Sequence, residues 1–409
     1  MRSPMRAAVV TSWLLALVAC GGGAGSPASA ASGGDDAGGD DALAPSDDGG
    51  GGGGGGGDGA SPSDGNDGPA PDAGDPTLHV EGNHLVYHGV TTRLLGVDHS
   101  GSEYACIQNG GYGIFEGPDP DTLAAAMLTW GHVNAVRLPL NEDCWLGING
   151  VNPMYGGQAY RSAIVDYVNK LHAHGLFVVV DLHWNAPGTS PSTAQQPMAD
   201  ADHAVDFWKS VATTFAGDGL TVFDLYNEPY VDTMNAQTTD AWACWLSGCT
   251  ITQSAGGVQG TWKSAGMQDL VDAVRSTGAR NVLMLGGLAY ADDLSGWLAH
   301  VPNDPLKQLA ASFHLYNFNS CTNTSCWSSV IAPIAQQHPV VTGELGENDC
   351  GHGFIDGYMP WADTNGVSYL AWTWNTWDCS SGPALITDYG GTPTGFGQGL
   401  KAHLLVTSP

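Results

Sequence analysis

The sequence predicts an α/β fold, a (β/α)8 TIM barrel closed by a β-hairpin cap at one end. Short, almost wholly apolar runs alternate with amphipathic segments, and eight such runs follow one another along the chain. Continuous apolar strands alternating with helices indicate a parallel sheet that is covered on its outside. The count of eight favours a closed barrel over an open sheet. No Gly-x-Gly-x-x-Gly pattern follows the first strand, which argues against a dinucleotide-binding fold.

Residues 77–409 are predicted to form one domain, a size that is ordinary for a barrel with long loops. The domain opens with Leu78–Tyr87, in which Glu81-Gly82-Asn83 separates two alternating apolar stretches. That pattern is typical of a β-hairpin. We expect the hairpin to cap the bottom of the barrel.

The elements of the barrel follow in order. Strands are predicted at 93–97, 133–138, 176–182, 220–225, 281–285, 309–313, 339–342 and 367–373. Helices are predicted at 119–130, 158–174, 204–215 and 262–277. The first helix begins with an N-cap and a proline, Asp119-Pro120. Helices are expected to end at Gly131, Gly175, Gly278 and Gly366, each shortly before a strand. The strand-to-helix connections are long and the helix-to-strand connections short, so the loops at the carboxyl ends of the strands are expected to be elaborate.

Residues 21–76 consist almost entirely of Gly, Ala, Ser, Pro and Asp, with eleven aspartates, no Lys or Arg, and a glycine run from Gly49 to Gly57. This composition buries too little apolar surface to offset chain entropy, so a flexible, extended tether is predicted. A calcium loop at Asp47-Asp48-Gly49 is the alternative. It is disfavoured because neither spaced ligands nor a closing glutamate follow.

Residues 1–20 have the pattern of an export signal. Arg2 and Arg6 form a basic start, and Ala7–Val18 is apolar but too short to span a membrane stably. The following Cys20, in Leu17-Val18-Ala19-Cys20, resembles the lipidated cysteine of a bacterial lipobox. We expect an exported protein that is lipid-anchored at the bacterial cell surface or outer membrane, or secreted. An ordinary signal peptide is the alternative.

The chain is acidic, with a formal net charge of −29. The eleven aspartates of residues 21–76 contribute −11 and Arg2 and Arg6 contribute +2, which leaves −20 for the predicted domain. Twelve basic residues in the whole chain cannot form a phosphate-binding surface, so nucleic acid is not expected as a partner. Fourteen tryptophans are consistent with a neutral ligand that stacks on rings, although tryptophans also fill cores.

Eight cysteines remain after Cys20, and export makes disulfides plausible. Cys244–Cys249 and Cys321–Cys326 would each close a small local loop. Cys106–Cys144 and Cys350–Cys379 would then join neighbouring loops. Eight cysteines allow 105 pairings, so this set is one preference among many. A zinc site is the rival, but the sequence contains no paired Cys-x-x-Cys.

Two glutamates are presented at predicted strand ends. Glu228 ends the run Phe223–Pro229, and Glu344 follows Val340–Gly343 116 residues later. Active sites of such barrels form at the carboxyl ends of the strands. A retaining glycosidase needs at least two carboxylates at its site. Either motif taken alone is also compatible with an ordinary turn.

The strand ends of residues 77 to about 400 together resemble glycoside hydrolase family 5, the cellulase-type family of (β/α)8 retaining glycosidases. The matching residues are Arg137 in Asn134–Pro139, His183 in Val180–Trp184, Asn227 and Glu228 in Asn227-Glu228-Pro229, His314 and Tyr316 in Phe313–Tyr316, Glu344 in Gly343–Gly346, and Trp372 before Thr373.

The resemblance implies a role for each of these residues. Glu344 is expected to be the nucleophile, kept ionised by Arg137 and Tyr316. Glu228 is expected to be the acid/base, held protonated by the nearby anion and by partial desolvation. Asn227 is expected to contact the 2-hydroxyl of the sugar, and Trp372 its flat face. His183 and His314 are expected to orient the sugar or the two carboxyls.

Other aromatic and polar residues lie in or beside the same loops. Trp184 and Trp377 are predicted as outer sugar platforms, and Trp145 and Trp374 are further candidates. Because alternation places Trp374 on the same side as Trp372, the two could exchange roles. His99 and Glu103 are also candidates to line the site. A metal site would favour His-x-His on the first strand, where the sequence has Asp98-His99-Ser100 instead.

The sequence therefore predicts an O-glycosyl hydrolase that cleaves cellulose-type β-1,4-glucan internally with retention of configuration. Action on β-mannan, xyloglucan or mixed-linkage glucan is the nearest alternative. A non-catalytic glycan-binding surface protein is an alternative of another class. No cofactor or metal is expected. The expected partners are a polysaccharide and, through the anchor, a membrane, and the protein is expected to be a monomer.

Overall fold

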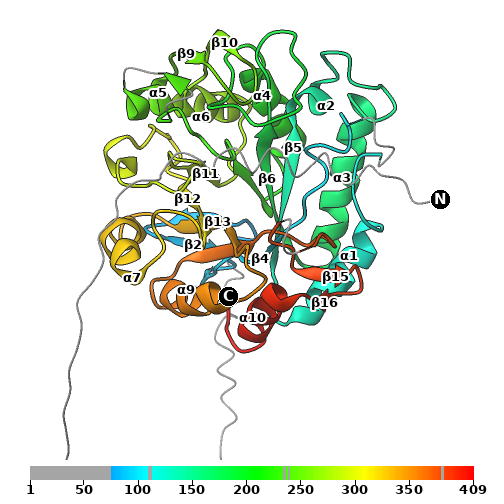
Figure 1. Ribbon diagram of the computed structural model, residues 1–409, viewed down its shortest axis with the longest axis vertical. Helices are drawn as coiled ribbons and strands as arrows, with labels where there is room; N and C mark the ends of the chain where they lie inside the picture. The colour runs from blue at the N-terminus through cyan, green and yellow to red at the C-terminus, as the bar shows by residue number, and fades with distance from the viewer. Residues whose placement is uncertain (1–74, 109–112, 234–235, 238–239, 379–381) are drawn as a thin grey trace, which may run out of the picture. The chain divides into compact units, whose positions relative to one another are not determined.

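Eight parallel strands form a closed barrel in the order β11-β12-β13-β14-β4-β5-β6-β7, which confirms the predicted fold class (Figure 1). The computed structural model describes residues 75–108, 113–233, 236–237, 240–378 and 382–409. The predicted signal at 1–20, with Cys20, and the predicted tether up to residue 74 lie outside these residues. No helix among the described residues has both the length and the apolar character needed to cross a membrane.

All eight predicted barrel strands are present. They are β4 (Leu95–Asp98), β5 (Ala135–Asn141), β6 (Phe177–Trp184), β7 (Thr221–Asp224), β11 (Leu283–Gly286), β12 (Leu309–Tyr316), β13 (Val340–Gly346) and β14 (Ser368–Ala371). Every residue in them is buried except the half-buried Trp184. This burial explains why the strands read as unbroken apolar runs, since both faces of the sheet are covered.

The helices that surround the barrel also follow local sequence signals. They are α1 (Pro120–Met127), α2 (Glu142–Leu146), α3 (Gln158–Ala173), α4 (Ala204–Phe215), α5 (Ala241–Ser247), α6 (Met267–Ser276), α7 (Thr324–Cys326), α8 (Ala332–Ala335), α9 (Gly353–Thr364) and α10 (Gly395–Leu404), with single turns η2 (Leu128–Trp130), η3 (Trp297–Ala299) and η4 (Trp327–Ile331). The Asp119 side chain caps α1 by accepting the Thr122 backbone N–H. Gly175, at φ +79°, follows α3 in a conformation that suits glycine.

One predicted helix begins later than expected. Trp262 was assigned to the start of the helix that leads to strand β11, but it lies in β10 (Gly260–Lys263). This strand pairs antiparallel with β9 (Thr250–Gln253), to which the short β8 (Ala236–Gln237) is added. The helix α6 begins only after Gly266. The β-prone Thr261 and Trp262 thus form part of a hairpin in the long loop after β7.

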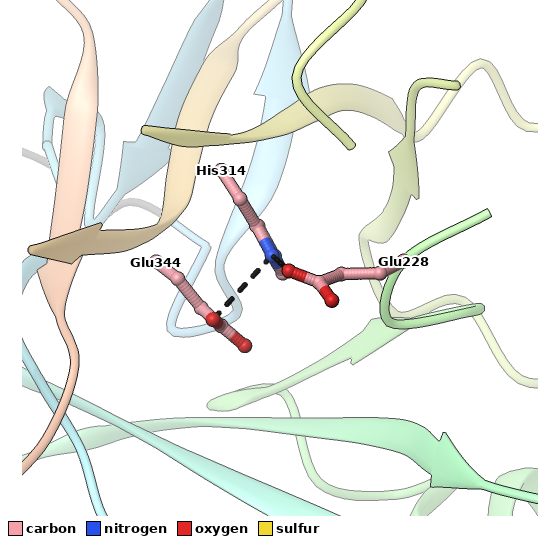
Figure 2. Close-up of side chains that lie close together, drawn as sticks. All are labelled: Glu228, His314 and Glu344. Carbon is pink, nitrogen blue, oxygen red and sulfur yellow. Dashed lines mark hydrogen bonds and ion pairs between the residues drawn. The ribbon is translucent and has the colours of Figure 1, made fainter. Parts of the chain in front are cut away.

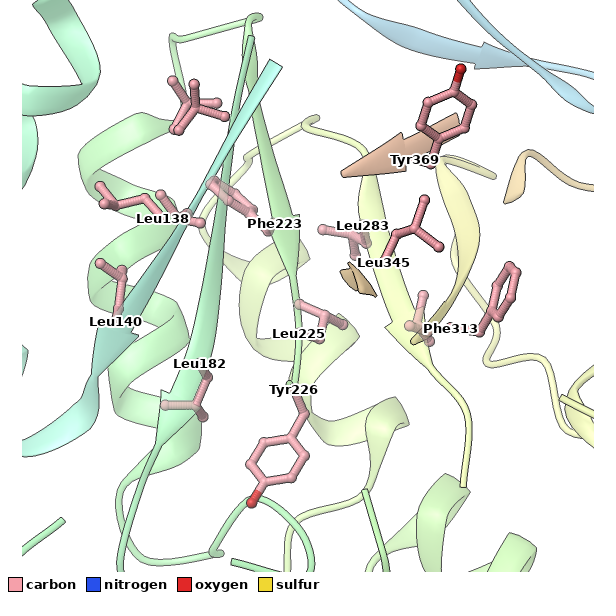
Figure 3. Packing of buried hydrophobic residues seen from close by; sticks show 14 of the residues in the cluster. Leu138, Leu140, Leu182, Phe223, Leu225, Tyr226, Leu283, Phe313, Leu345 and Tyr369 are labelled. Atoms are coloured by element: carbon pink, nitrogen blue, oxygen red, sulfur yellow. The ribbon is translucent and has the colours of Figure 1, made fainter. Parts of the chain in front are cut away.

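The barrel has an outer and an inner core. The outer core packs strand residues such as Leu138 and Phe223 against the helices (Figure 3). The inner core fills the bottom of the barrel and includes Leu78 and Leu85 of the N-terminal segment. That segment forms β1 (His79–Glu81), β2 (His84–Tyr87) and β3 (Val90–Thr91), so the predicted hairpin cap is confirmed and carries a third strand. A small hairpin, β15 (Ile386–Asp388) and β16 (Thr392–Pro393), follows β14.

Three disulfides join loops at the carboxyl ends of the strands, as predicted. Cys106–Cys144 connects the loops after β4 and β5, while Cys244–Cys249 and Cys321–Cys326 each close a local loop. Cys350 is also disulfide-bonded. Its expected partner, Cys379, lies outside the described residues. The loops that carry these disulfides are the ones that surround the candidate site.

Candidate active site

Five strands bring charged side chains to one point at the carboxyl end of the barrel, and Arg137 of β5 lies at its centre. The guanidinium has no exposed surface. It lies 2.9 Å from an oxygen of Glu344 and 3.1 to 3.2 Å from three aspartates. These are Asp98 on β4, Asp181 on β6 and Asp224 on β7. One cation is therefore shared by four carboxylates.

The crowding of buried charge changes the pKa values of the residues in this cluster. Burial raises the pKa of Asp98 well above its usual range and that of Asp224 to about 7, although Arg137 lowers both. Burial lowers the pKa of Arg137, but its four carboxylate neighbours raise it well above its ordinary value. Near neutral pH the cluster therefore keeps its cation, and burial favours the protonated forms of Asp98 and Asp224.

Glu344, on β13, is held by two donors. Its Oε1 accepts a hydrogen bond from Arg137 Nη1 at 2.9 Å, and its Oε2 accepts one from the Tyr316 hydroxyl at 2.5 Å. Burial and the adjacent Glu344 raise the pKa of Tyr316, which therefore remains a donor. Gly346 makes room for the ring of Tyr316, because a Cβ there would lie 2.6 Å from Tyr316 Cε1. These two donors hold the Glu344 carboxyl in a fixed orientation.

Glu228 lies just beyond the end of β7 in a different environment. Its side chain is buried, and its two carboxyl oxygens contact His314 Nδ1 at 2.9 Å and Gln195 Nε2 at 3.1 Å. Burial raises the pKa of Glu228 to about 7, although the Gln195 hydrogen bond and the charges of His183 and Arg137 lower it. Glu228 was expected to keep its proton because of the nearby anion as well as partial desolvation. Burial is the main cause of its raised pKa. Glu228 therefore holds its proton up to about neutral pH.

His314, at the end of β12, lies between the two glutamates (Figure 2). Its Nδ1 is 2.9 Å from Glu228 Oε1 and 3.5 Å from Glu344 Oε2. Burial lowers the pKa of His314 to about 3, so the ring is neutral over the ordinary pH range. One oxygen of each glutamate lies within 4.8 Å of the other. That upper limit is compatible with the roughly 5–5.5 Å between the carboxyl groups of retaining glycosidases.

The same three side chains are the only group of His, Cys, Asp and Glu in the described part of the chain that could jointly hold a metal ion. Their oxygens already have protein partners. Glu344 is bonded to Arg137 and Tyr316, and Glu228 to His314 and Gln195. The donor set therefore fits a hydrogen-bonded carboxyl pair better than a cation site.

Trp372 and His183 face the same region from β14 and β6. Trp372 follows β14 directly, and its peptide bond to Thr373 is cis. Its ring lies 5.5 Å from that of His183, with the planes 10° apart. Burial lowers the pKa of His183, but Asp181, 2.8 Å from Nδ1, together with Glu103 and Glu344 raises it to about 9. A charged, fixed imidazole and a flat indole therefore border the carboxyl pair.

Of the predicted outer platforms, Trp184 and Trp377 keep partly accessible side chains. Trp184, at the end of β6, lies 6.2 Å from the ring of Tyr104. Trp377 donates its indole N–H to Glu116 Oε2 at 3.2 Å. Trp184 ends its strand and Trp377 lies in the loop after β14, so both are at the carboxyl end of the barrel, where a sugar could reach them.

The two other tryptophan candidates are wrong, because neither has any exposed surface. Trp145 packs among the outer helices and donates to Ser210 Oγ at 3.0 Å. Trp374 packs 4.7 Å from Trp130 in the outer core. The possible exchange of roles between Trp372 and Trp374 is therefore excluded.

His99 and Glu103, the further candidates in the first loop, are also almost fully buried. His99 Nδ1 hydrogen-bonds the Tyr167 hydroxyl at 2.8 Å. Glu103 accepts the Gly101 backbone N–H at 2.7 Å. These residues support the loop, and Glu103 contributes to the raised pKa of His183.

Sequence reasoning missed four residues of the site. Asp98, Asp181 and Asp224 were read only as parts of strand motifs, yet an aspartate inside an apolar strand is itself a signal, since a buried carboxylate needs a partner. Gln195 had no comparable signal. It belongs to the long 185–203 loop, and only the folded chain brings it to Glu228.

Comparisons with known proteins agree with this geometry. Residues 99–378 match the family model described as Cellulase (glycosyl hydrolase family 5). A mannan endo-1,4-beta-mannosidase of Salipaludibacillus agaradhaerens is 22% identical over 307 residues, which cover 73% of this chain and 81% of the relative.

Two solved structures have the same fold, each at 20% identity. The β-glucanase SdGluc5_26A of Saccharophagus degradans in complex with cellotetraose matches with a TM-score of 0.57, covering 83% of this chain and 98% of its own. A β-mannanase of Streptomyces thermolilacinus with mannohexaose matches with a TM-score of 0.58, covering 82% and 97%. Because the family model spans more than half of the sequence, the chain belongs to glycosyl hydrolase family 5 and is an O-glycosyl hydrolase.

Proposed function

We propose that this enzyme hydrolyses internal β-1,4 linkages of a glucan with retention of configuration, using Glu344 as nucleophile and Glu228 as acid/base. The observation that carries the proposal is the contrast between two neighbouring carboxyls. Glu344 accepts hydrogen bonds from Arg137 and Tyr316, whereas burial raises the pKa of Glu228 to about 7. Adjacent carboxyls with opposite environments are suited to opposite roles.

In the first step, a Glu344 oxygen attacks the anomeric carbon. The bond to the glycosidic oxygen breaks, and Glu228 gives its proton to that oxygen as the sugar leaves. Arg137 and Tyr316 fix the orientation of the attacking carboxylate. The oxygen that accepts the Tyr316 hydrogen bond, Oε2, is also the one that lies 3.5 Å from His314 Nδ1. The product is a glycosyl ester of Glu344.

In the second step, Glu228 acts as a base. Now ionised, it takes a proton from a water molecule, which attacks the anomeric carbon and releases Glu344. The hydrogen bond from Gln195 suits this stage, because an N–H donor stabilises a carboxylate. The neutral ring of His314 supports the other oxygen when its Nδ1 carries the proton. The second inversion restores the original configuration.

Asn227 is oriented for contact with the sugar. Its Oδ1 accepts a hydrogen bond from Arg137 Nη2 at 2.8 Å, and arginine is always a donor. The amide NH2 group is therefore left to donate to the 2-hydroxyl, a contact that strengthens in the transition state. Trp372 supplies a flat surface beside the same sugar.

β-1,4-Mannan is the second candidate substrate. Mannan and glucan share the β-1,4 linkage and differ only in the configuration of the 2-hydroxyl, the group that Asn227 is proposed to contact. The mannan endo-1,4-beta-mannosidase relative and the mannanase structure support this candidate, as the β-glucanase structure supports the first.

A side-by-side assay distinguishes the candidates. Release of reducing ends is measured on carboxymethyl cellulose, lichenan, xyloglucan, β-mannan and glucomannan, and the anomer first formed from a hexasaccharide is followed by NMR. We expect the highest kcat/KM on a β-1,4-glucan and initial release of the β-anomer. Glu344→Gln is expected to abolish turnover. Initial release of the α-anomer, or near-normal activity of Glu344→Gln, would contradict the mechanism.

We also propose that the protein is exported and lipid-anchored through Cys20, on the basis of the sequence pattern at residues 17–20. Expression with a labelled fatty acid tests this. Label is expected in the full-length protein and in its membrane fraction, and it should be lost in Cys20→Ser. Labelling that survives this substitution would exclude Cys20 as the anchor.

A further inference from the structure

We propose that Glu142 and Asp200 share one buried proton, and that this proton closes the 185–203 loop at its ends and so positions Gln195 against Glu228. Glu142 is the first residue of α2, after β5, and Asp200 lies near the end of the loop after β6. The proposal goes beyond the reaction itself. Its consequence for catalysis rests on the proposed role of Glu228, whereas the shared proton does not.

The two carboxyls are hydrogen-bonded to each other inside the protein. Neither residue has any exposed surface, and their side chains form a hydrogen bond. Two carboxylates offer only acceptors, so one of the pair must carry a proton. Asp200 already accepts three N–H groups, from Asn185 Nδ2 at 2.9 Å and from the backbone of Asp202 and His203 at 3.0 and 2.8 Å. In the described part of the chain no N–H or hydroxyl group donates to Glu142 Oε1, which is therefore the oxygen suited to carry the proton.

Glu142 contacts both ends of the loop. Its Oε2 accepts the Ala186 backbone N–H at 3.3 Å, where the loop begins, and its proton reaches Asp200, where the loop ends. The end of the loop is itself fastened, because the Ala201 N–H donates to Lys263 O of β10 at 2.9 Å. Asp200 is therefore a fixed point to which Glu142 holds the start of the loop.

The loop between these ends carries Gln195 to the carboxyl pair. Residues 186–199, all of them described, form no helix or strand. The Tyr226 hydroxyl donates to Asn185 Oδ1 at 2.9 Å and to Gln196 O at 2.7 Å, which joins the start of the loop to the residue after Gln195. A loop without regular structure holds Gln195 in place only while such contacts fix its ends.

The surroundings of Glu142 favour the form that carries the proton. Burial raises the pKa of Glu142 well above its usual range, and the charges of Asp200 and Asp143 raise it further, although the Ala186 N–H lowers it. Burial also raises the pKa of Asp143 itself. Burial raises the pKa of the adjacent Tyr226 well above its usual range, so its hydroxyl remains a donor. The pair therefore keeps its proton near neutral pH.

The other charged side chains near the pair are directed elsewhere. Asp202 Oδ2 accepts a backbone N–H from earlier in the loop at 2.9 Å, and His203 Nε2 contacts a backbone carbonyl there at 2.8 Å. The side chain of Lys263 is exposed, and Asp206 and Lys209 of α4 form an exposed pair with each other. The shared proton therefore remains the direct link between the two carboxyls.

Opening of the loop should release this proton. In the open loop Glu142 would have its ordinary pKa of about 4.5, whereas in the closed loop its pKa is raised. The stability that the proton gives to the closed loop is complete below the ordinary value and is lost as pH rises through the raised one. Between the two values opening releases one proton, so the open fraction should rise about tenfold per pH unit.

Hydrogen exchange of the peptide 185–203, corrected for the intrinsic rate at each pH, measures this opening. Glu142→Gln keeps both contacts, since its amide can donate to Asp200 and accept from Ala186, but it has no proton to release. The ratio of wild-type to Glu142→Gln protection is expected to fall about tenfold per pH unit from about pH 5.5 to 7.5. Glu81→Gln is the matched control, because Glu81 is an exposed residue of β1, and its ratio should stay constant.

Two results of this experiment would overturn the shared proton. One is a ratio of wild-type to Glu142→Gln protection that stays constant within about twofold over the same pH range. The other is a ratio that rises with pH, since the sign is then opposite to that of a proton held by the closed loop. Neither result depends on activity, so the exchange data decide this point even if the proposed reaction is wrong.

A double-variant experiment tests the connection to catalysis. At about pH 5.5, kcat on a β-1,4-linked hexasaccharide is expected to fall about tenfold in Glu142→Ala and in Gln195→Ala, the typical effect of losing one hydrogen bond to a charged group. Because both act through the same contact with Glu228, the double variant should lose little more than either single one. Glu142→Gln should restore wild-type activity.

Losses that multiply in the double variant would overturn the connection between Glu142 and Gln195, since independent sites give additive free energies. A Glu142→Gln enzyme as slow as Glu142→Ala would also overturn it, because the glutamine keeps the hydrogen bonds that close the loop. Failure of the wild type to release reducing ends would instead reject the proposed function.

Discussion

Gln195 donates its side-chain amide to Glu228 twice, to the backbone carbonyl at 2.9 Å and to the carboxyl oxygen Oε2 at 3.1 Å. An amide N–H stabilises the ionised carboxyl, and this bond lowers the Glu228 pKa against the effect of burial. Gln195 therefore acts through Glu228 as a positioning residue, and it partly offsets the tendency of the buried acid to keep its proton.

Replacement of Gln195 is expected to move the pH profile. In Gln195→Ala the Glu228 pKa should rise, because the carboxylate loses a donor while the buried acid does not. The alkaline limb of kcat/KM should shift to higher pH, and the second step, which needs ionised Glu228, should slow. Gln337→Ala is the control, since Gln337 is exposed and precedes the amino end of β13, whereas the carboxyl pair lies at the carboxyl ends of the strands. If activity falls in Gln195→Ala but the alkaline limb does not shift, Gln195 has only a structural role.

The wild-type enzyme should lose activity above neutral pH. The reaction starts with protonated Glu228, whose pKa is about 7, so kcat/KM on polysaccharide should fall about tenfold per pH unit at higher pH. A disaccharide β-fluoride needs no proton donor and should not show this limb. The comparison of the two profiles assigns the limb to Glu228, and an identical limb on the fluoride would assign it elsewhere.

Glu228→Gln should make the folded enzyme more stable in alkaline solution. Because the folded-state pKa of Glu228 is raised above its ordinary value of 4.5, the stability linked to its proton is complete below that value and is lost as pH rises through about 7. The glutamine variant does not titrate, so its advantage in Tm should be largest above pH 7 and smallest at pH 4. Measurement of Tm at both pH values tests the sign.

Arg137→Met should be strongly destabilising. The substitution leaves four buried carboxylates without their cation, and breaking a buried ion pair costs about 3–5 kcal/mol. Urea unfolding at pH 6 measures the change in free energy. The control is Lys209→Met, whose pair with Asp206 is exposed and should contribute less than about 1 kcal/mol. Similar losses in the two variants would show that the cluster stabilises little.

The sequence predicted the barrel because its strands are buried on both faces and its helices carry local caps, as at Asp119. It also predicted which residues meet at the site, because strand ends converge wherever the loops go. Prediction from the sequence failed where long-range packing decides which side chains are buried and which reach the site. Trp145 and Trp374 have the same local pattern as surface tryptophans and yet fill the outer core. Gln195 reaches the site only through a loop conformation that no short pattern encodes.

The ion cluster around Arg137 has a consequence for folding. Its five members come from β4, β5, β6, β7 and β13, so they span almost the whole domain in sequence. The cluster cannot form until β13 has joined the first four strands of the barrel. A chain with a partly assembled barrel would lack an aligned Glu344, and recovery of catalysis during refolding should therefore follow the closing event of assembly more closely than any measure of helix content.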